Sequence, residues 1–298
     1  MAQTTIGDAH GLYKVWVGLV DDKGYNMGIA GPDVANNTLT EPYHMRYVQS
    51  AEISMQDRTV INFTGGDVWT GSFIYGITQL GTFSLTNATV EAELIALLSD
   101  SAIDQTLNTR QTIYSENIML ASPPQVWMMI VFRLQSKEPG TKGASKFMNL
   151  ILPRVWMSPK GLSGAPAFQA NSTYGYQIVP TVGDRMPFGP LFSTSTLGLA
   201  NDETPVFYII TDYPLHTVTI KATASASMTV NLPYLPVYFD VTTPDSATDP
   251  VQVYVNGVQV DATSVNLTTG AVVVPSGGTF VAGDIITVLY ETNYVEAP

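Results

Sequence analysis

Alternating hydrophobic and polar positions recur along most of the chain and predict β-strands. Seven segments rich in β-branched and aromatic residues are bounded by clusters of Gly, Pro and Asp, which is the pattern of strands separated by turns. We expect these strands at residues 13–20, 59–63, 68–77, 126–134, 147–157, 206–211 and 217–230, with a further candidate at 174–180. The fold is therefore predicted to be mainly β.

One segment, residues 88–99, has the periodicity of an amphipathic helix instead. Val90, Leu94, Leu97 and Leu98 recur at helical spacing, and glutamates occupy the first turn, where the helix dipole favours anions. We expect this helix to lie on a sheet, which gives an α+β arrangement dominated by β.

The pattern changes after a proline-rich joint at residues 233–244. Strict alternation over 251–255 runs into Asn256-Gly257, a strong signal for a β-hairpin, and further strands are expected at 271–274 and 285–290. We predict two domains: residues 1–235, and a small C-terminal β-sandwich-like, Ig-like module at residues 236–298. A module of this size has a marginal core and is expected to be stabilised by packing against the neighbouring domain.

Two long segments, residues 21–50 and 161–204, carry few periodic runs and many Gly, Pro, Asn and Thr. Loops of this length are uncommon in a compact domain unless they have a role. Arms that become ordered against neighbouring subunits would explain them, although a strand within them would do so as well.

The residue composition argues against catalysis. The 298 residues include 45% hydrophobic positions, enough for a core, but no cysteine and only three histidines. The absence of cysteine excludes disulfides, thiolate zinc sites and cysteine nucleophiles. No nucleophile elbow, phosphate-binding loop or dinucleotide glycine pattern occurs. We expect no enzymatic activity, no cofactor and no bound metal.

Two acidic patterns were weighed against that expectation. Adjacent carboxylates could serve a glycosidase, and a run of aspartates could supply oxygen ligands to calcium. Adjacent acids in turns are usually only solvated, however, and the aspartate run lacks a calcium-loop signature. The residues concerned are Asp21 with Asp22, Asp202 with Glu203, and the run Asp240, Asp245 and Asp249.

The first residues, MAQTTIGD, have neither the basic region nor the apolar region of a signal peptide. The longest apolar stretch, residues 126–132, is too short to cross a bilayer. We therefore expect a chain that is made in a cytoplasm and has no membrane partner.

Charge is unevenly distributed along the chain. There are 25 acidic and 13 basic residues, a net charge of -12. Residues 236–298 hold seven acids and no Lys or Arg, whereas residues 131–160 hold six bases against Glu138 alone. This asymmetry suggests charge-complementary surfaces, although lysines on a solvated hairpin would also explain the basic block. A specific nucleic-acid binder should be basic, but an acidic wall would repel DNA and leave it mobile.

The order of the predicted elements resembles a known family. An early strand with its turn (residues 11–24), paired strands through Gly65–Gly71 and a lone helix with an acidic start (residues 88–99) are similar to the tail tube proteins, or major tail proteins, of long-tailed bacteriophages. The later strands and the module after the proline-rich joint are similar as well. The resemblance covers about residues 1–235 and rests on element order rather than on a motif.

The resemblance implies a β-sandwich or half-barrel with one flanking helix. It further implies hexameric rings that stack into a tube, with joined sheets lining a lumen and the C-terminal module outside, so that deletion of residues 236–298 should leave assembly intact. The protein would be a virion structural protein of the tail, assembled in the bacterial cytoplasm. Its partners would be itself, passing double-stranded DNA that is not specifically bound, and tape-measure, tail terminator and baseplate proteins. The family implies no catalytic residue.

Candidate contact residues follow from the charge pattern. The basic block is expected to form a hairpin whose Lys137, Lys142 and Lys146 meet an acidic surface of the next ring. The candidate lumen acids are Glu52, Asp57 and Asp67.

Two other classes remain as alternatives. One is another phage structural protein, a capsid decoration or baseplate component. The other is a carbohydrate-binding or hydrolytic β-sandwich with Trp127 and Trp156 as platforms, although both tryptophans lie in strongly apolar strands that are typical of a core.

Overall fold

The computed structural model confirms the mainly β class. Most of the residues that it describes lie in strands, and no helix occurs among them. The predicted helix at 88–99 lies outside the described residues from residue 89 onward. The structure describes residues 8–20, 41–46, 48–54, 60–65, 68–74, 82–88, 103–104, 113–114, 125–135, 145–165, 169–178, 207–237, 251–256, 258–275 and 280–296.

Eight antiparallel strands form the main sheet, in the order β2-β1-β9-β10-β11-β6-β3 with β12 also paired to β10. The long β10 pairs with β12 through its first part and with β11 through its second. The candidate strand at 174–180 overlaps β11 over residues 174–178, and its last two residues lie outside the described part. The bounds are β1 Asp8–Leu19, β2 Tyr43–Met45, β3 Val48–Ser54, β6 Thr82–Asn87, β9 Gln125–Gln135, β10 Ser145–Ala165, β11 Gln169–Ile178 and β12 Phe207–Thr211.

This sheet curls back on itself. In a flat sheet β3 would lie about 24 Å from β1, because five spacings of about 4.8 Å separate them. The two strands are nevertheless in contact. The inner face of the curl holds a hydrophobic core, to which β1 contributes Val15, β9 Met128, β10 Leu150 and β6 Leu85. Alternate residues of β1 and β9 therefore point into this core, as strand periodicity requires.

The C-terminal strands form a β-sandwich around a second core. One sheet has the order β13-β20-β16-β17, with β15 also paired to β20, and the other has the order β14-β19-β18. Val218, Val253, Val272 and Val288 lie in the core between them. The bounds are β13 Leu215–Lys221, β14 Ser227–Asn231, β15 Tyr234–Pro236, β16 Val251–Val255, β17 Val258–Val260, β18 Ser264–Val265, β19 Ala271–Pro275 and β20 Ile285–Glu296.

The predicted hairpin at Asn256-Gly257 is confirmed. Strands β16 and β17 pair antiparallel with Val255 opposite Val258. Asn256 has a φ of 49°, the left-handed conformation that this turn demands and that asparagine tolerates.

The sandwich begins before the predicted domain boundary. Strands β13 and β14 precede residue 236 and β15 ends at it, yet they pair with β20 and β19. The hydrogen-bonded unit therefore starts at Leu215, and the proline-rich joint lies inside it. The single strand expected at 217–230 is in fact two strands, separated by residues 222–226. The predicted division fails to match this unit because turn residues mark where strands end but not which strands pair.

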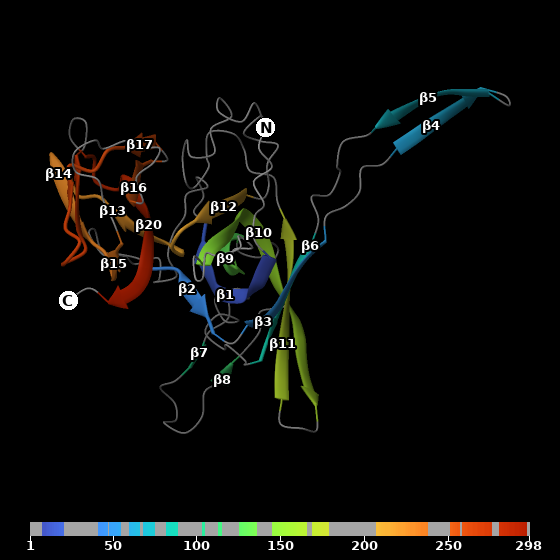
Figure 1. Ribbon diagram of the computed structural model, residues 1–298, viewed down its shortest axis with the longest axis horizontal. Helices are drawn as coiled ribbons and strands as arrows, with labels where there is room; N and C mark the ends of the chain where they lie inside the picture. The colour runs from blue at the N-terminus through green and yellow to red at the C-terminus, as the bar shows by residue number, and fades with distance from the viewer. Residues whose placement is uncertain are drawn as a thin grey trace.

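The sandwich packs on the outer face of the main sheet (Figure 1). Trp16 and Trp127 of the main sheet lie in one buried cluster with Leu215, Tyr254 and Leu289 of the sandwich. Deletion of residues 236–298 would remove part of this cover and the strands paired with β13 and β14. In contrast to the sequence-based prediction that assembly survives this deletion, we now expect the loss of residues 236–298 to disrupt the fold.

Hydrogen bonds fix the passage from the main sheet into the sandwich. The Asn149 side chain donates from Nδ2 to Thr211 Oγ1 at 2.8 Å and accepts at Oδ1 from the Leu215 backbone N–H at 3.2 Å. The Glu291 carboxylate accepts from the Tyr213 backbone N–H at 3.0 Å. Asn149 is fully buried, so these bonds tie β10, β12 and β13 together where a lost partner would be costly.

Two small hairpins complete the described structure. β4 (Val60–Gly65) pairs with β5 (Val68–Ile74), and β7 (Ile103–Asp104) pairs with β8 (Ile113–Tyr114). Among the described residues, β4 and β5 pair only with each other. Figure 1 shows their hairpin extended well away from both larger units.

Candidate functional site

One of the three predicted inter-ring lysines lies within the described residues. Lys146 is the second paired residue of β10 and lies opposite Leu134, and β9 and β10 pair antiparallel from Ser145 opposite Gln135 onward. Lys146 is exposed and forms an ion pair with Asp212 of its own chain at 3.6 Å. Exposed pairs of this kind contribute little to stability. Lys137 and Lys142 lie outside the described residues, so the role of the three lysines stays a prediction.

One of the three predicted lumen acids is described as well. Glu52 is an exposed residue of β3, the last strand of the main sheet, and lies opposite Ser84 of β6. Asp57 and Asp67 lie outside the described residues. The structure therefore places Glu52 on a solvent-facing part of the sheet without placing it beside either of the other acids.

The carbohydrate-platform alternative receives no support from Trp127. This side chain is only 1% exposed and belongs to the cluster between the main sheet and the sandwich. A stacking platform must be accessible to the sugar, and Trp127 is not. The side chain of Trp156 lies outside the described part of the structure.

An aromatic cluster centred on Tyr294 joins the two units. The Trp16 indole N–H donates to the Tyr294 hydroxyl at 3.1 Å, and that hydroxyl donates to the Leu215 carbonyl at 3.0 Å. The Trp16 and Tyr294 rings stack with centroids 5.7 Å apart. Tyr294 has a φ of 58°, a conformation that is strained for a bulky residue and that persists only when its surroundings fix it. The contacts of its ring and hydroxyl supply that constraint.

His216 is buried within this cluster. It is 0% exposed, and neither ring nitrogen has a hydrogen-bond partner among the described residues. Its ring makes edge contacts with those of Trp16, Tyr234 and Tyr290. Burial, followed by the positive charges of Lys14 and His44, lowers its pKa to about 3. His216 is therefore a neutral packing residue.

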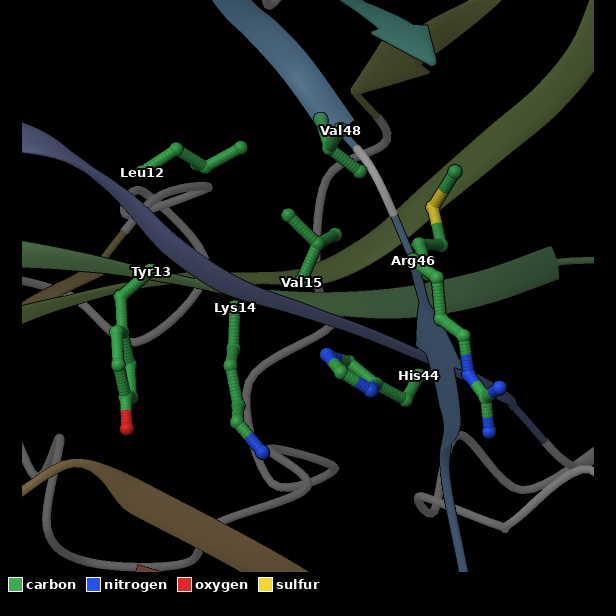
Figure 2. A pocket seen from close by; sticks show the side chains of 8 residues that line it. Leu12, Tyr13, Lys14, Val15, His44, Arg46 and Val48 are labelled. Carbon is green, nitrogen blue, oxygen red and sulfur yellow. The ribbon is translucent and has the colours of Figure 1, made fainter. Parts of the chain in front are cut away.

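A pocket of about 400 Å³ lies where β2 leaves the edge of β1, and we call it the β1 notch. Strand β2 pairs with β1 only at Val15, Trp16 and Val17. No described strand pairs with that edge of β1 before Val15. Lys14, His44 and Arg46 line the notch and point to the same side of β1 in Figure 2, while Leu12 and Val48 line it on the other side.

A β-bulge shapes this notch. The register of β1 against β9 shifts between Leu12 and Lys14. Successive residues of a regular strand alternate between faces, but a bulge breaks the alternation. Tyr13 and Lys14 consequently point to the same side in Figure 2. Sequence reasoning missed this group, because neither the bulge nor the approach of His44 and Arg46 leaves a periodic signal.

Strand β12 presents an open edge. It pairs with β10 on one side, and no described strand pairs with its other side. Tyr208 is 62% exposed and Ile210 is 39% exposed, so apolar side chains accompany this edge. Unpaired strand edges with exposed apolar residues are sites where another chain can add.

The described residues show neither a metal-binding cluster nor a membrane-spanning helix. No group of three or more His, Asp or Glu side chains there could hold a metal ion. No helix of that part is long and apolar enough to span a bilayer. The acids weighed for glycosidase and calcium chemistry all lie outside it.

The chain was also compared with known proteins. No protein-family model matches the sequence, and no curated protein has a significant match to it.

Proposed function

We propose that the chain is a virion structural protein that polymerises into stacked hexameric rings and forms the tail tube of a long-tailed bacteriophage. The tube would be an acidic conduit for DNA and ejected proteins. The observation that carries the proposal is the open edge of β12 on a curled sheet, with Tyr208 and Ile210 exposed along it. Such an edge favours strand addition from a second copy, and head-to-tail addition of identical subunits generates rings or filaments.

The β4–β5 hairpin supports assembly independently. An isolated two-stranded hairpin is at best marginally stable in water. This one pairs with no other described strand and extends away from the sheets (Figure 1). Contact with a neighbouring subunit would provide the packing that the described strands of its own chain do not.

The charge of the chain supports a conduit rather than a DNA-binding surface. The net charge is -12, and Glu52 on β3 is exposed. Phosphate contacts supply most of the affinity of proteins for DNA, and they require basic side chains. An acidic wall would let DNA pass without holding it.

Negative-stain electron microscopy of the concentrated protein tests the proposal. We expect hollow tubes or rings, and monomers that persist at all salt concentrations would refute it. Trimeric knobs without tubes would favour the capsid-decoration or baseplate class instead.

A matched pair of variants tests the role of the β12 edge. Ile210→Lys introduces a charge at that edge and should abolish assembly, because lysine on an edge strand opposes pairing with another strand. Val281→Lys makes the same change at a position of the sandwich that is 67% exposed and should assemble normally. Equal assembly of both variants would show that the β12 edge is not part of the interface.

A further inference from the structure

Lys14 is a half-buried cation without a counter-ion in the described part of the chain. Its ammonium lies 3.4 Å from the centroid of the Tyr294 ring and 5.3 Å from that of Trp16. No described carboxylate forms an ion pair with it, and burial lowers its pKa. A partly desolvated charge with only aromatic partners is less well compensated than one beside an anion.

The field around His44 is positive as well. Burial, followed by the positive charges of Lys14 and Arg46, lowers the pKa of His44 to about 4. Glu41 and Glu296 lie close enough to affect Tyr234, as does Arg46, but neither acid is among the groups that act on His44. The β1 notch is therefore locally positive in a chain whose net charge is -12.

The size of the notch and its chemistry define what it would hold. Its volume of about 400 Å³ lies within the range of small-ligand sites. Arg46 already has a partner in the chain, so the uncompensated charge is the single charge of Lys14. A monoanion would balance it, whereas a phosphate would bring an excess of negative charge.

We propose that the β1 notch is an anion subsite that holds one carboxylate against Lys14, flanked by His44 and Arg46. The carboxylate can be that of a small free ligand or of an Asp or Glu side chain from a second copy, because the recognising chemistry is the same. A carboxylate accepts charge-assisted hydrogen bonds from the ammonium, and these are stronger than neutral ones.

Trifluoroacetate is a suitable probe, because it is a monoanionic carboxylate that reports its own binding by fluorine NMR. The full chain is examined at neutral pH, dilute enough to be unassembled, with chloride holding the ionic strength constant. We expect saturable binding in the millimolar range, as the small size of the probe dictates. Absence of saturable binding would overturn the proposal, as would displacement by inorganic phosphate at lower concentrations than by acetate.

Three variants assign the binding to Lys14. Lys14→Met should weaken it at least about tenfold, since it removes a charge-assisted hydrogen bond. Lys14→Arg should retain it and so distinguishes charge from packing. Lys221→Met makes the same charge change at the end of β13 and should bind as the unmodified chain does. Equal losses in Lys14→Met and Lys221→Met would contradict a local site.

The source of the carboxylate is determined by following bound trifluoroacetate while the protein concentration is increased. Release of trifluoroacetate on association identifies a carboxylate of the second copy, and retention identifies a free ligand. A chain that binds the probe but never associates supports the subsite while contradicting the proposed function, so the two failures are distinguishable.

Discussion

Replacement of His216 by phenylalanine should make the protein less sensitive to acid. The His216 ring is fully buried among aromatic rings, and neither of its nitrogens is hydrogen-bonded within the described residues. Phenylalanine keeps the aromatic contacts and removes two buried polar atoms. We therefore expect the free energy of unfolding of His216→Phe at pH 8 to equal or exceed that of the unmodified protein.

The pH dependence follows from the lowered pKa of His216. In the folded state this pKa is about 3, whereas an unfolded histidine titrates near 6.5. Below pH 6.5 the unfolded chain binds a proton that the folded chain does not, so the contribution of neutral His216 to stability is complete above 6.5 and declines as the pH falls towards 3. The linkage relation gives a loss of about 2 kcal/mol at pH 5, with a slope of at most about 1.4 kcal/mol per pH unit.

Guanidinium chloride unfolding, followed by tryptophan fluorescence at several pH values, measures this loss. Between about pH 8 and pH 5, His216→Phe should lose about 2 kcal/mol less than the unmodified protein. Thr217→Val is a matched control, because it removes a neighbouring buried hydroxyl that also lacks a described partner but does not titrate. An unchanged pH slope in His216→Phe would refute the reasoning, since it would mean that His216 is not a neutral buried group.

Three further predictions concern the interfaces. Tyr294→Phe removes a hydroxyl that takes part in two hydrogen bonds and should lower the free energy of unfolding, measured by denaturant titration, by about 2 to 3 kcal/mol. Tyr208→Phe removes the hydroxyl of an exposed side chain and should change the free energy of unfolding by less than about 0.5 kcal/mol. Deletion of residues 236–298 should give aggregated or unfolded protein in gel filtration and circular dichroism; a soluble, folded, assembling truncation would contradict the packing of the sandwich. Replacement of Lys137 and Lys142 by Glu should weaken ring stacking, and the effect should depend on salt concentration when tubes are examined by electron microscopy. Unchanged tubes would indicate that both lysines are only solvated residues of a hairpin.

The sequence predicts those strands whose signal is local, but it misses β2, β3 and β6 of the main sheet. A continuous apolar run identifies β9, alternation identifies β16, and Asn256 identifies a turn by a conformation that few residues tolerate. Pairing partners carry no such signal. The contact between β13 and β20 joins residues about seventy positions apart, so the boundary placed at residue 236 cut through one sandwich.

The candidate site was less accessible to sequence reasoning than the fold. Lys14 reads as an ordinary exposed lysine in an alternating strand, and His44 as an isolated histidine. Their proximity depends on the bulge near Tyr13 and on the pairing of β2 with β1, which places His44 opposite Trp16. Both features arise from tertiary contacts, since a bulge depends on the partner strand as much as on its own residues.

The burial of β9 limits where a conduit could run along this subunit. Met128 and Ile130 point into the core of the curled sheet, while Trp127 and Met129 face the sandwich, so over residues 126–131 neither face of this strand is open to solvent. A lumen wall requires a solvent-exposed sheet face, and within the described residues of β3 Glu52 is exposed. An acidic wall built from the described sheet must therefore come from its β3 end, with the sandwich covering the outer face of β1 and β9.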